Sequence, residues 1–260
     1  MVKASFKDFT DAVNAHRLWL YMAGNDIRLR YRGSTLGPVW ITLTMVVFIA
    51  AISIVYSRLF HQHLNEYIPF LTAGILIWTY MSSVINESTE TFLSSKEFIE
   101  GMKMPYFLFI FRTIWRNILV FFHNFIVYLL VVIFFHVPVH LCTLLAIPGF
   151  VLVTGILAAV SVIVSLLGTR FRDLPPIINA MISVVFFVSP VTWQSKLVGE
   201  DSLIVQLNPV SHLLDLIRSP LLGYWPQASS VVIAVLLLLI LWVVAFLVFS
   251  ANSRKIPFWL

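Results

Sequence analysis

Three arginines at alternate positions near the start of the chain are the residues best suited to bind an ionic ligand. Arg28, Arg30 and Arg32 lie within the segment 26–40, and Tyr31 stands among them. The planar guanidinium group donates two parallel hydrogen bonds that match two phosphate oxygens. A juxtamembrane basic cluster also attracts anionic lipid head groups. The cluster therefore predicts contact with a phosphate, and a plain topology anchor is the other interpretation.

A second candidate site is the segment 86–105, which mixes ionic and apolar side chains. Its central residues are Ser95, Lys96, Glu97, Phe98 and Ile99. A short amphipathic helix of this kind docks its apolar side in a groove on a partner protein. A solvated connector is the alternative, and the apolar residues at 92, 93, 98 and 99 favour docking.

Patterns for catalysis and metal binding are weak. No lysine is followed by Ser or Thr, so the end of a phosphate-binding loop is missing, and any ATP hydrolysis belongs to another chain.

His61 and His63 lie near Glu66, which we interpret as a polar loop rather than a metal site. His123 falls inside an apolar run, where an ionisable group is a functional candidate; because it stands alone, we favour a hydrogen-bonded structural role. The single cysteine, Cys142, excludes a disulfide framework and a thiolate metal site.

The composition indicates which kind of protein must position these residues. Of 260 residues, 60% are hydrophobic, while 17 are basic and 12 acidic, and the mean hydropathy is +0.93. A soluble domain carries about 25% charged residues, against 11% in this chain. A soluble enzyme, a disordered protein and a nucleic-acid binder are therefore excluded. An all-α, polytopic membrane protein remains.

Six apolar runs are candidates for helices that cross a bilayer, which needs about 20 residues per crossing. They carry no charged residue over 37–56, 68–85, 117–135, 141–167, 174–191 and 228–251. The third helix is expected to begin near Phe107. The fifth opens at Pro175-Pro176, and proline is accepted in the first turn of a helix. The pattern predicts six transmembrane helices.

Two further segments are apolar but too interrupted to cross. The stretch 203–223 is broken at Asn208-Pro209 and carries Asp215 and Arg218, which predicts two short re-entrant outer helices between the fifth and sixth spans. The first 36 residues combine apolar side chains at helical spacing with charges, which predicts one or two amphipathic helices at the membrane interface. We expect a single domain: an interfacial segment over 1–36, a membrane domain over 37–251 and a tail over 252–260.

The basic residues set the orientation. With the N-terminus inside, 14 Lys and Arg residues fall in cytoplasmic segments, and three fall outside, namely Arg58, Lys196 and Arg218. Cytoplasmic loops of membrane proteins carry an excess of Lys and Arg. Both termini are therefore expected in the cytoplasm, and the net charge of +5 reports orientation rather than an anionic ligand.

The acidic residues distinguish between classes of membrane protein. None of the 12 lies in the middle of a predicted span, whereas ion-coupled carriers place carboxylates there. A membrane-embedded acyl or glycosyl transferase is the competing class. It would need an essential group near the lipid–water boundary, for which His123, Asp173 and Asp215 are the candidates.

Taken in order, the motifs resemble those of the permease subunit of ABC-2-type exporters, in particular exporters of lipid-linked polysaccharide such as O-antigen, capsule or teichoic acid. The resemblance rests on Asp-Ile-Arg-Leu-Arg-Tyr-Arg at 26–32, Leu-Gly-Pro-Val-Trp at 36–40, Phe-Arg-Asp-Leu at 171–174 and Asn208-Pro209. It covers essentially the whole chain. Each motif is weakly specific alone, and the set does not identify the glycan.

The resemblance implies an assembly in the bacterial inner membrane. Two copies of the chain would form the channel, and two ABC ATPase subunits, which carry the ATP and Mg, would bind below. The loop 86–105 would hold the coupling helix. This chain would need no cofactor and no nucleic-acid partner.

The resemblance also implies a substrate route. A glycan on undecaprenyl diphosphate would enter at Arg28, Arg30 and Arg32. The chain has 22 Phe, 8 Trp and 8 Tyr, and ring faces let a sugar polymer slide. Residues expected to line or flank that path are Tyr31, Trp40, Tyr80 and Trp193, although interfacial anchoring explains Trp40 and Trp193 equally well. An ABC-2 exporter of another lipid or small molecule is the alternative.

Overall fold

The computed structural model describes residues 2–59, 63–197 and 202–260, and all regular elements within these ranges are helices. Two helices, α1 (Val2–Asn14) and α2 (His16–Arg30), precede the first long apolar helix, α3 (Val39–Leu59). The other α-helices follow in the order α4 (Leu64–Ser88), α5 (Lys96–Gly101), α6 (Tyr106–Phe135), α7 (Ala146–Arg170), α8 (Leu174–Val188), α9 (Leu203–Gln206), α10 (Pro209–Leu221), α11 (Ala228–Asn252) and α12 (Ile256–Trp259). Short 3₁₀ helices cover Leu93–Ser95, Leu141–Leu145, Ser195–Leu197 and Ser253–Lys255.

Five helices in the described residues are long and apolar enough to cross a membrane. They are α3, α4, α6, α7 with the 3₁₀ turn before it, and α11 with the segment after it. Each coincides with a span predicted from the sequence, and α6 begins at Tyr106, next to the expected Phe107. The all-helical fold class is therefore confirmed for the described residues, and five of the six predicted spans correspond to helices long and apolar enough to cross a membrane.

The fifth predicted span, 174–191, corresponds to α8, which is shorter than expected. It has 15 residues, or about 22 Å at 1.5 Å per residue, against a hydrocarbon core of about 30 Å. The helix ends at Val188 because Ser189 precedes Pro190 and has an extended backbone; a residue before proline is driven out of the helical region. A sixth crossing remains a prediction.

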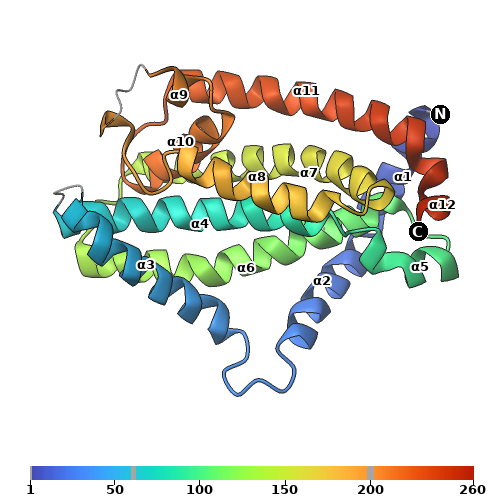
Figure 1. The fold of residues 1–260 in the computed structure, drawn as a ribbon, viewed down its shortest axis with the longest axis horizontal. Coiled ribbons are helices and arrows are strands. Elements are labelled where there is room, and N and C mark those ends of the chain that lie inside the picture. Colours follow the sequence, from blue (N-terminus) through green and yellow to red (C-terminus); the bar gives the residue numbers. More distant parts are fainter. Residues whose placement is uncertain (1, 60–62, 198–201) are drawn as a thin grey trace.

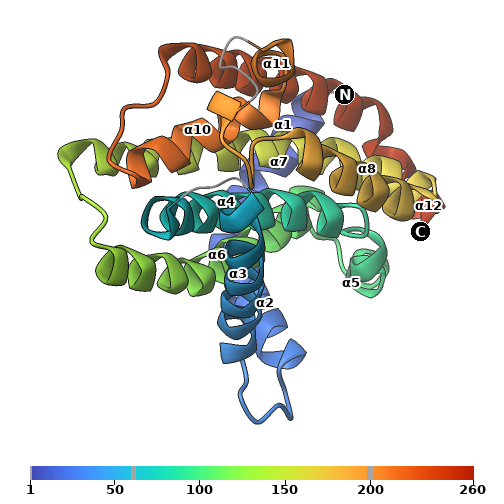
Figure 2. The same cartoon turned by 60° about the vertical axis from the view of Figure 1, so that its left-hand side comes forward.

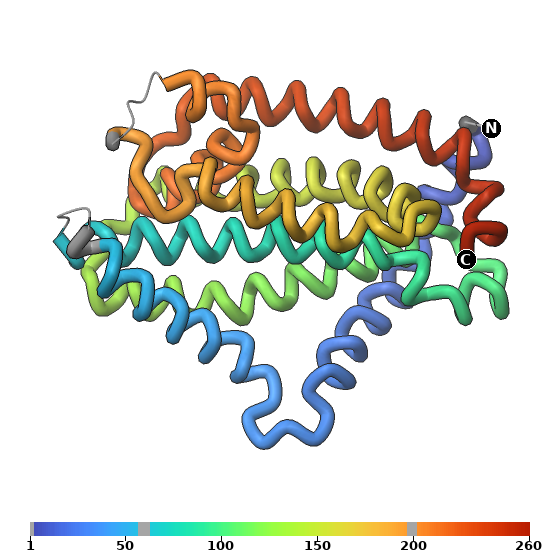
Figure 3. Tube along the Cα trace, in the orientation of Figure 1, coloured from blue at the N-terminus to red at the C-terminus, as the bar shows by residue number. Residues whose placement is uncertain are grey.

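Figures 1 and 2 show a bundle in which α4, α6 and α7 run side by side, with α11 against α7 and α8 along one flank. The two termini lie at the end of the bundle that also holds α1, α5 and α12 (Figure 1). Helices α2 and α3 project from the bundle as a pair, joined by the turn over 31–38 (Figure 3). Most of α3 is exposed; its buried residues recur every fourth position and are Ile41, Met45, Ile49 and Ser53.

The N-terminal amphipathic segment forms two helices. In α1, Phe9 packs its ring edge-on against rings of α6 and α11, with centroids 5.3 Å from Phe107 and 5.8 Å from Trp242. On the opposite side of α1, Lys7 and Asn14 are exposed. This division of faces agrees with a helix that lies across the end of the bundle.

The stretch 203–223 breaks where the sequence predicts. Asn208 begins α10, and its side-chain oxygen accepts a hydrogen bond from the backbone N–H of Val210 at 3.0 Å. The helix before the break, α9, is a single turn. In α10, Arg218 is 92% buried, donates to the carbonyl of Pro190 at 2.6 Å and lies 4.3 Å from the ring centroid of Phe70.

Candidate functional site

A cluster of ionic side chains joins α2, α4 and α6 near the end of the bundle that holds the termini. Asp26 of α2 receives two hydrogen bonds from Arg112 of α6, at 2.8 and 2.6 Å, in the bidentate geometry of an arginine–carboxylate pair. Arg116, one turn further along α6, donates to Asp26 at 2.9 Å and to Glu87 of α4 at 2.8 Å. Arg116 therefore links the two carboxylates.

Two further residues complete this ionic cluster. Asn117 donates to Glu87 at 2.7 Å, and Arg30 of α2 donates to the other oxygen of Glu87 at 3.1 Å. The side chains of Asp26, Arg112, Arg116 and Glu87 are only 15–24% exposed, whereas Arg30 is 49% exposed. Arg30 is therefore the edge of the cluster that solvent and ligands reach.

The three predicted phosphate-binding arginines are not equivalent. Arg30 is held by Glu87, while Arg28 and Arg32 are exposed, and neither has an ion-pair partner within the described part of the chain. Tyr31 is partly buried at the end of α2. Arg28 and Arg32 are therefore available to bind a ligand, next to Arg30, whose side chain Glu87 already orients.

The segment predicted to couple to a partner does contain a short helix. It is α5, preceded by the 3₁₀ turn Leu93–Ser95. Its apolar side chains, however, pack on this chain: Ile99 contacts the hydrophobic core, and the ring centroid of Phe98 lies 5.7 Å from the guanidinium of Arg112. The exposed side chains of the 3₁₀ turn and α5 are polar, namely Ser94, Lys96, Glu97 and Glu100, and Met102 directly after α5 is also exposed.

The C-terminal segment borders α5. The amine of Lys96 donates to the backbone oxygen of Leu260 at 2.7 Å and pairs with Glu100 at 3.5 Å. Trp259 lies 5.7 Å from the guanidinium of Arg170 at the end of α7. Phe258, in contrast, is 88% exposed. Lys96 therefore links α5 to the residue that follows α12.

Asp8 of α1 binds the N-terminus of α6, the helix that follows α5 in the chain. Its two carboxylate oxygens accept the backbone N–H groups of Tyr106 and Phe107 at 3.1 and 3.0 Å, which are free donors at a helix N-terminus. Burial raises the pKa of Asp8, and the two N–H donors oppose that rise by stabilising the charged form. Helix α1 is therefore anchored to the N-terminus of α6.

The four aromatic residues predicted along a sugar path lie apart. Tyr80 is 3% exposed, donates or accepts a hydrogen bond with Thr154 at 2.9 Å and packs against Phe121. Trp193 donates to the carbonyl of Phe187 at 3.2 Å, and Trp40 is exposed at the start of α3. Tyr80 belongs to the core of the single chain, and no route is defined by these rings in the monomer.

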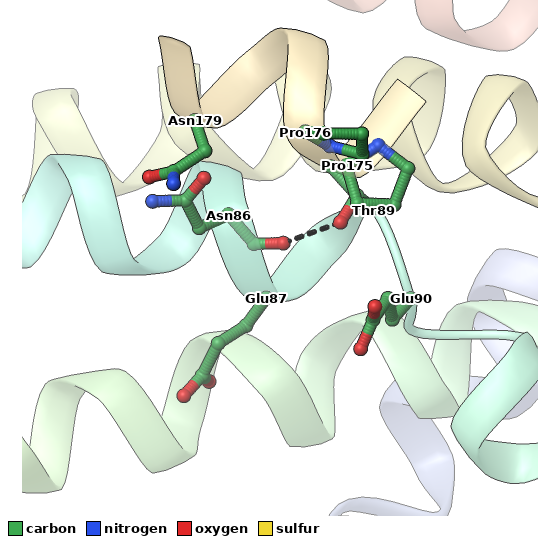
Figure 4. Close-up of a pocket in the computed structure, with 7 residues that line it drawn as sticks. All are labelled: Asn86, Glu87, Thr89, Glu90, Pro175, Pro176 and Asn179. Carbon is green, nitrogen blue, oxygen red and sulfur yellow. Dashed lines mark hydrogen bonds between the residues drawn. The ribbon is translucent and has the colours of Figure 1, made fainter. Parts of the chain in front are cut away.

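Two hollows adjoin α8. One, of about 370 Å³, lies between the end of α4 and the start of α8 (Figure 4) and is lined by Asn86, Glu87, Thr89, Glu90, Pro175, Pro176 and Asn179. The other, of about 320 Å³, lies between α3, α4 and α8 and is mostly apolar, with Trp78 and Phe186 among its lining residues. The first shares Glu87 with the ionic cluster.

The residues that a transferase would need are not gathered. The ring of His123 makes a hydrogen bond with the carbonyl of Leu119 in its own helix, as expected for a structural histidine. Asp215 accepts from Ser219 and from the backbone of Gln227, and Asp173 is exposed before α8. Among the described residues no group of three His, Cys, Asp or Glu side chains is arranged to hold a metal. The predicted polar loop includes His61, which lies outside the described residues.

The sequence pattern missed most of the ionic cluster. Arg112 and Arg116 are among the 14 basic residues that the charge pattern assigns to the cytoplasmic side, and they lie four residues apart on one face of α6, where side chains are neighbours. That spacing, in a segment otherwise apolar, was the available signal. Their partners, Asp26 and Glu87, lie on other helices and could not be paired with them from spacing.

Comparison with known proteins agrees with this arrangement. Residues 17–222 match the family described as ABC-2 type transporter, and the chain belongs to that family. It is therefore a multi-pass membrane protein of the transport class. Among curated relatives, an O-antigen export system permease protein RfbA of Klebsiella pneumoniae is 23% identical over 216 residues, covering 80% of this chain and 82% of the relative. The RfbA permease protein of Myxococcus xanthus is 22% identical over 211 residues, with 76% and 77% covered.

Proposed function

We propose that this chain is the membrane subunit of an ATP-driven exporter that moves a lipid-linked polysaccharide, O-antigen on undecaprenyl diphosphate, across the bacterial inner membrane. The names of the relatives support the substrate class. The observation that carries the proposal is the arginine cluster at the edge of a candidate span, where Arg28 and Arg32 are exposed beside Arg30. The diphosphate would bind these guanidinium groups.

The working unit in this proposal is a homodimer with two ATPase subunits. Helix α8 has no buried residue in the monomer, although its exposed apolar side chains form a stripe: Ile177, Met181, Val184, Phe187 and Val188. Helix α3 is likewise buried along one narrow stripe only. Contact with a second copy would cover these faces and enclose the substrate route between the two chains.

Six crossings complete the arrangement. Helix α8 would traverse the membrane together with the turn that follows it, and α9 and α10 would re-enter from the outer side. The polar side of α5 would then lie in the cytoplasm and dock on the ATPase. Both termini would be cytoplasmic.

Cysteine labelling tests this orientation and the docking of α5. In a Cys142→Ser background, Glu97→Cys on α5 and Arg254→Cys after α11 should resist an impermeant thiol reagent added from outside, whereas Glu66→Cys at the start of α4 should react. A bifunctional reagent should cross-link position 97, but not position 66, to the co-purified ATPase subunit. Outside labelling of position 254 would contradict the six crossings, and lack of any cross-link from 97 would contradict the docking.

Charge-preserving substitution tests the phosphate contact. Lysine at 28, 30 and 32 keeps the positive charge that sets orientation but removes the two-pronged hydrogen bond. We expect Arg28→Lys with Arg32→Lys to lower export about tenfold, the equivalent of roughly 1.4 kcal/mol, and the triple variant to lower it further while lipid-linked glycan accumulates inside. Arg17→Lys, exposed on the same helix, is the matched control. Full export by the triple variant would refute the phosphate role.

A further inference from the structure

The hollow between α4 and α8 is built for hydrogen bonding. Figure 4 shows the side-chain amides of Asn86 and Asn179 facing each other from the two helices, while the rings of Pro175 and Pro176 lie next to Thr89. Neither amide makes a side-chain hydrogen bond within the described residues. Thr89 differs, because its hydroxyl already donates to the backbone carbonyl of Asn86 at 2.6 Å.

The charges around this hollow define what it accepts. Its seven lining residues include two carboxylates, Glu87 and Glu90, and no basic side chain. Glu87 turns towards α6 and is satisfied by Arg116 and Asn117, while Glu90 is exposed. A phosphate would be repelled here, since like charges in proximity are unfavourable. A neutral ligand rich in hydroxyl groups suits the lining.

Sugar hydroxyls match the amides chemically. Each asparagine supplies two N–H donors and a carbonyl acceptor, and each sugar hydroxyl both donates and accepts. The proline rings offer an apolar surface for the C–H face of a pyranose ring. A volume of about 370 Å³ falls at the lower end of the range of small-ligand sites, roughly 300–1,000 Å³, so the ligand portion held there is short.

One residue, Glu87, belongs to both the hollow and the ionic cluster. It lines the hollow, while its carboxylate faces α6 and accepts a hydrogen bond from Arg30 at 3.1 Å. In a lipid-linked glycan the diphosphate is bonded directly to the first sugar. We propose that this hollow binds the first sugar of the glycan while the diphosphate lies on the arginines, an inference that rests on the function proposed above.

Binding of two synthetic lipids to the purified permease complex in nanodiscs tests this inference. One lipid is a bare polyprenyl diphosphate, and the other carries a single hexose on the same diphosphate. Two or three added hydrogen bonds predict about tenfold tighter binding of the hexose lipid. Asn86→Ala with Asn179→Ala should remove that difference and leave the affinity for the bare lipid unchanged. Asn65→Ala, exposed at the other end of α4, should leave both affinities unchanged.

The outcomes separate the two proposals. If the wild-type complex binds both lipids equally, or if the double asparagine variant keeps the preference for the hexose lipid, the sugar site is overturned and the phosphate site stands. If the bare lipid does not bind, or binds equally well to the triple lysine variant, the phosphate role fails instead. Unchanged affinity for the bare lipid also demonstrates that the asparagine variants are folded.

Discussion

Arg116→Met is expected to destabilise the protein by about 3 kcal/mol, near the lower end of the cost of breaking a buried ion pair. Arg116 is 18% exposed and links Asp26 to Glu87. Its removal leaves two largely buried carboxylates with one arginine partner each, Arg112 for Asp26 and Arg30 for Glu87. A methionine fills a similar volume, so the loss reports charge and hydrogen bonding rather than a cavity.

Thermal unfolding of the purified protein in detergent measures this effect. Arg28→Met is the matched control, because Arg28 is exposed on α2 and has no ion pair within the described residues; its unfolding should shift little. Neutralising both partners, with Arg116→Met and Glu87→Gln together, should recover part of the loss because only one carboxylate then lacks its second arginine. An unfolding transition for Arg116→Met that matches that of Arg28→Met would show that the ionic cluster does not hold the helices together.

Gly168→Ala is expected to be the most disruptive change of a single methyl group. A Cβ atom at Gly168 of α7 would collide with the backbone carbonyl oxygen of Thr89, directly after α4. Neither backbone can yield without moving a helix end, and overpacking of this kind costs about 1–3 kcal/mol. Because Thr89 and Glu90 line the hollow at α8, we also expect weaker export than the loss of stability alone would produce.

Gly24→Ala provides the comparison for this prediction. A Cβ at Gly24 of α2 would have no atom within 4 Å, and alanine gains up to about 1 kcal/mol in helix propensity over glycine. Unfolding and export are measured side by side for the two variants in the same membrane preparation. Equal stability of the two would mean that α7 does not approach the end of α4 as closely as the structure has it.

The membrane helices were predictable because their signal is local. Five uncharged runs became five long helices, and Asn208-Pro209 began α10 as expected. The length of α8 was less predictable: uncharged residues continue to Val191, but Pro190 stops the helix at Val188. Hydropathy counts apolar residues and does not register where the backbone geometry of a proline ends a helix.

The candidate site was predictable only in part, because its contacts join distant segments. The sequence singled out Arg30, yet its partner Glu87 is 57 residues away. The apolar residues of α5 were recognised, but whether Phe98 faces a partner or this chain depends on Arg112 of α6. Amphipathic spacing identifies a face and leaves open which surface covers it.

The unequal attachment of α2 gives this helix a pivot. Asp26 accepts three hydrogen bonds from the arginines of α6, whereas Arg30 donates one to Glu87 of α4. Glu87 would keep Arg116 and Asn117 if Arg30 turned away, so no carboxylate would be stranded by the exchange. A phosphate that draws Arg30 off Glu87 would free one edge of α2 while the other stays fastened to α6. Binding of an anion would then rotate α2 about its contact with α6 and would not detach it.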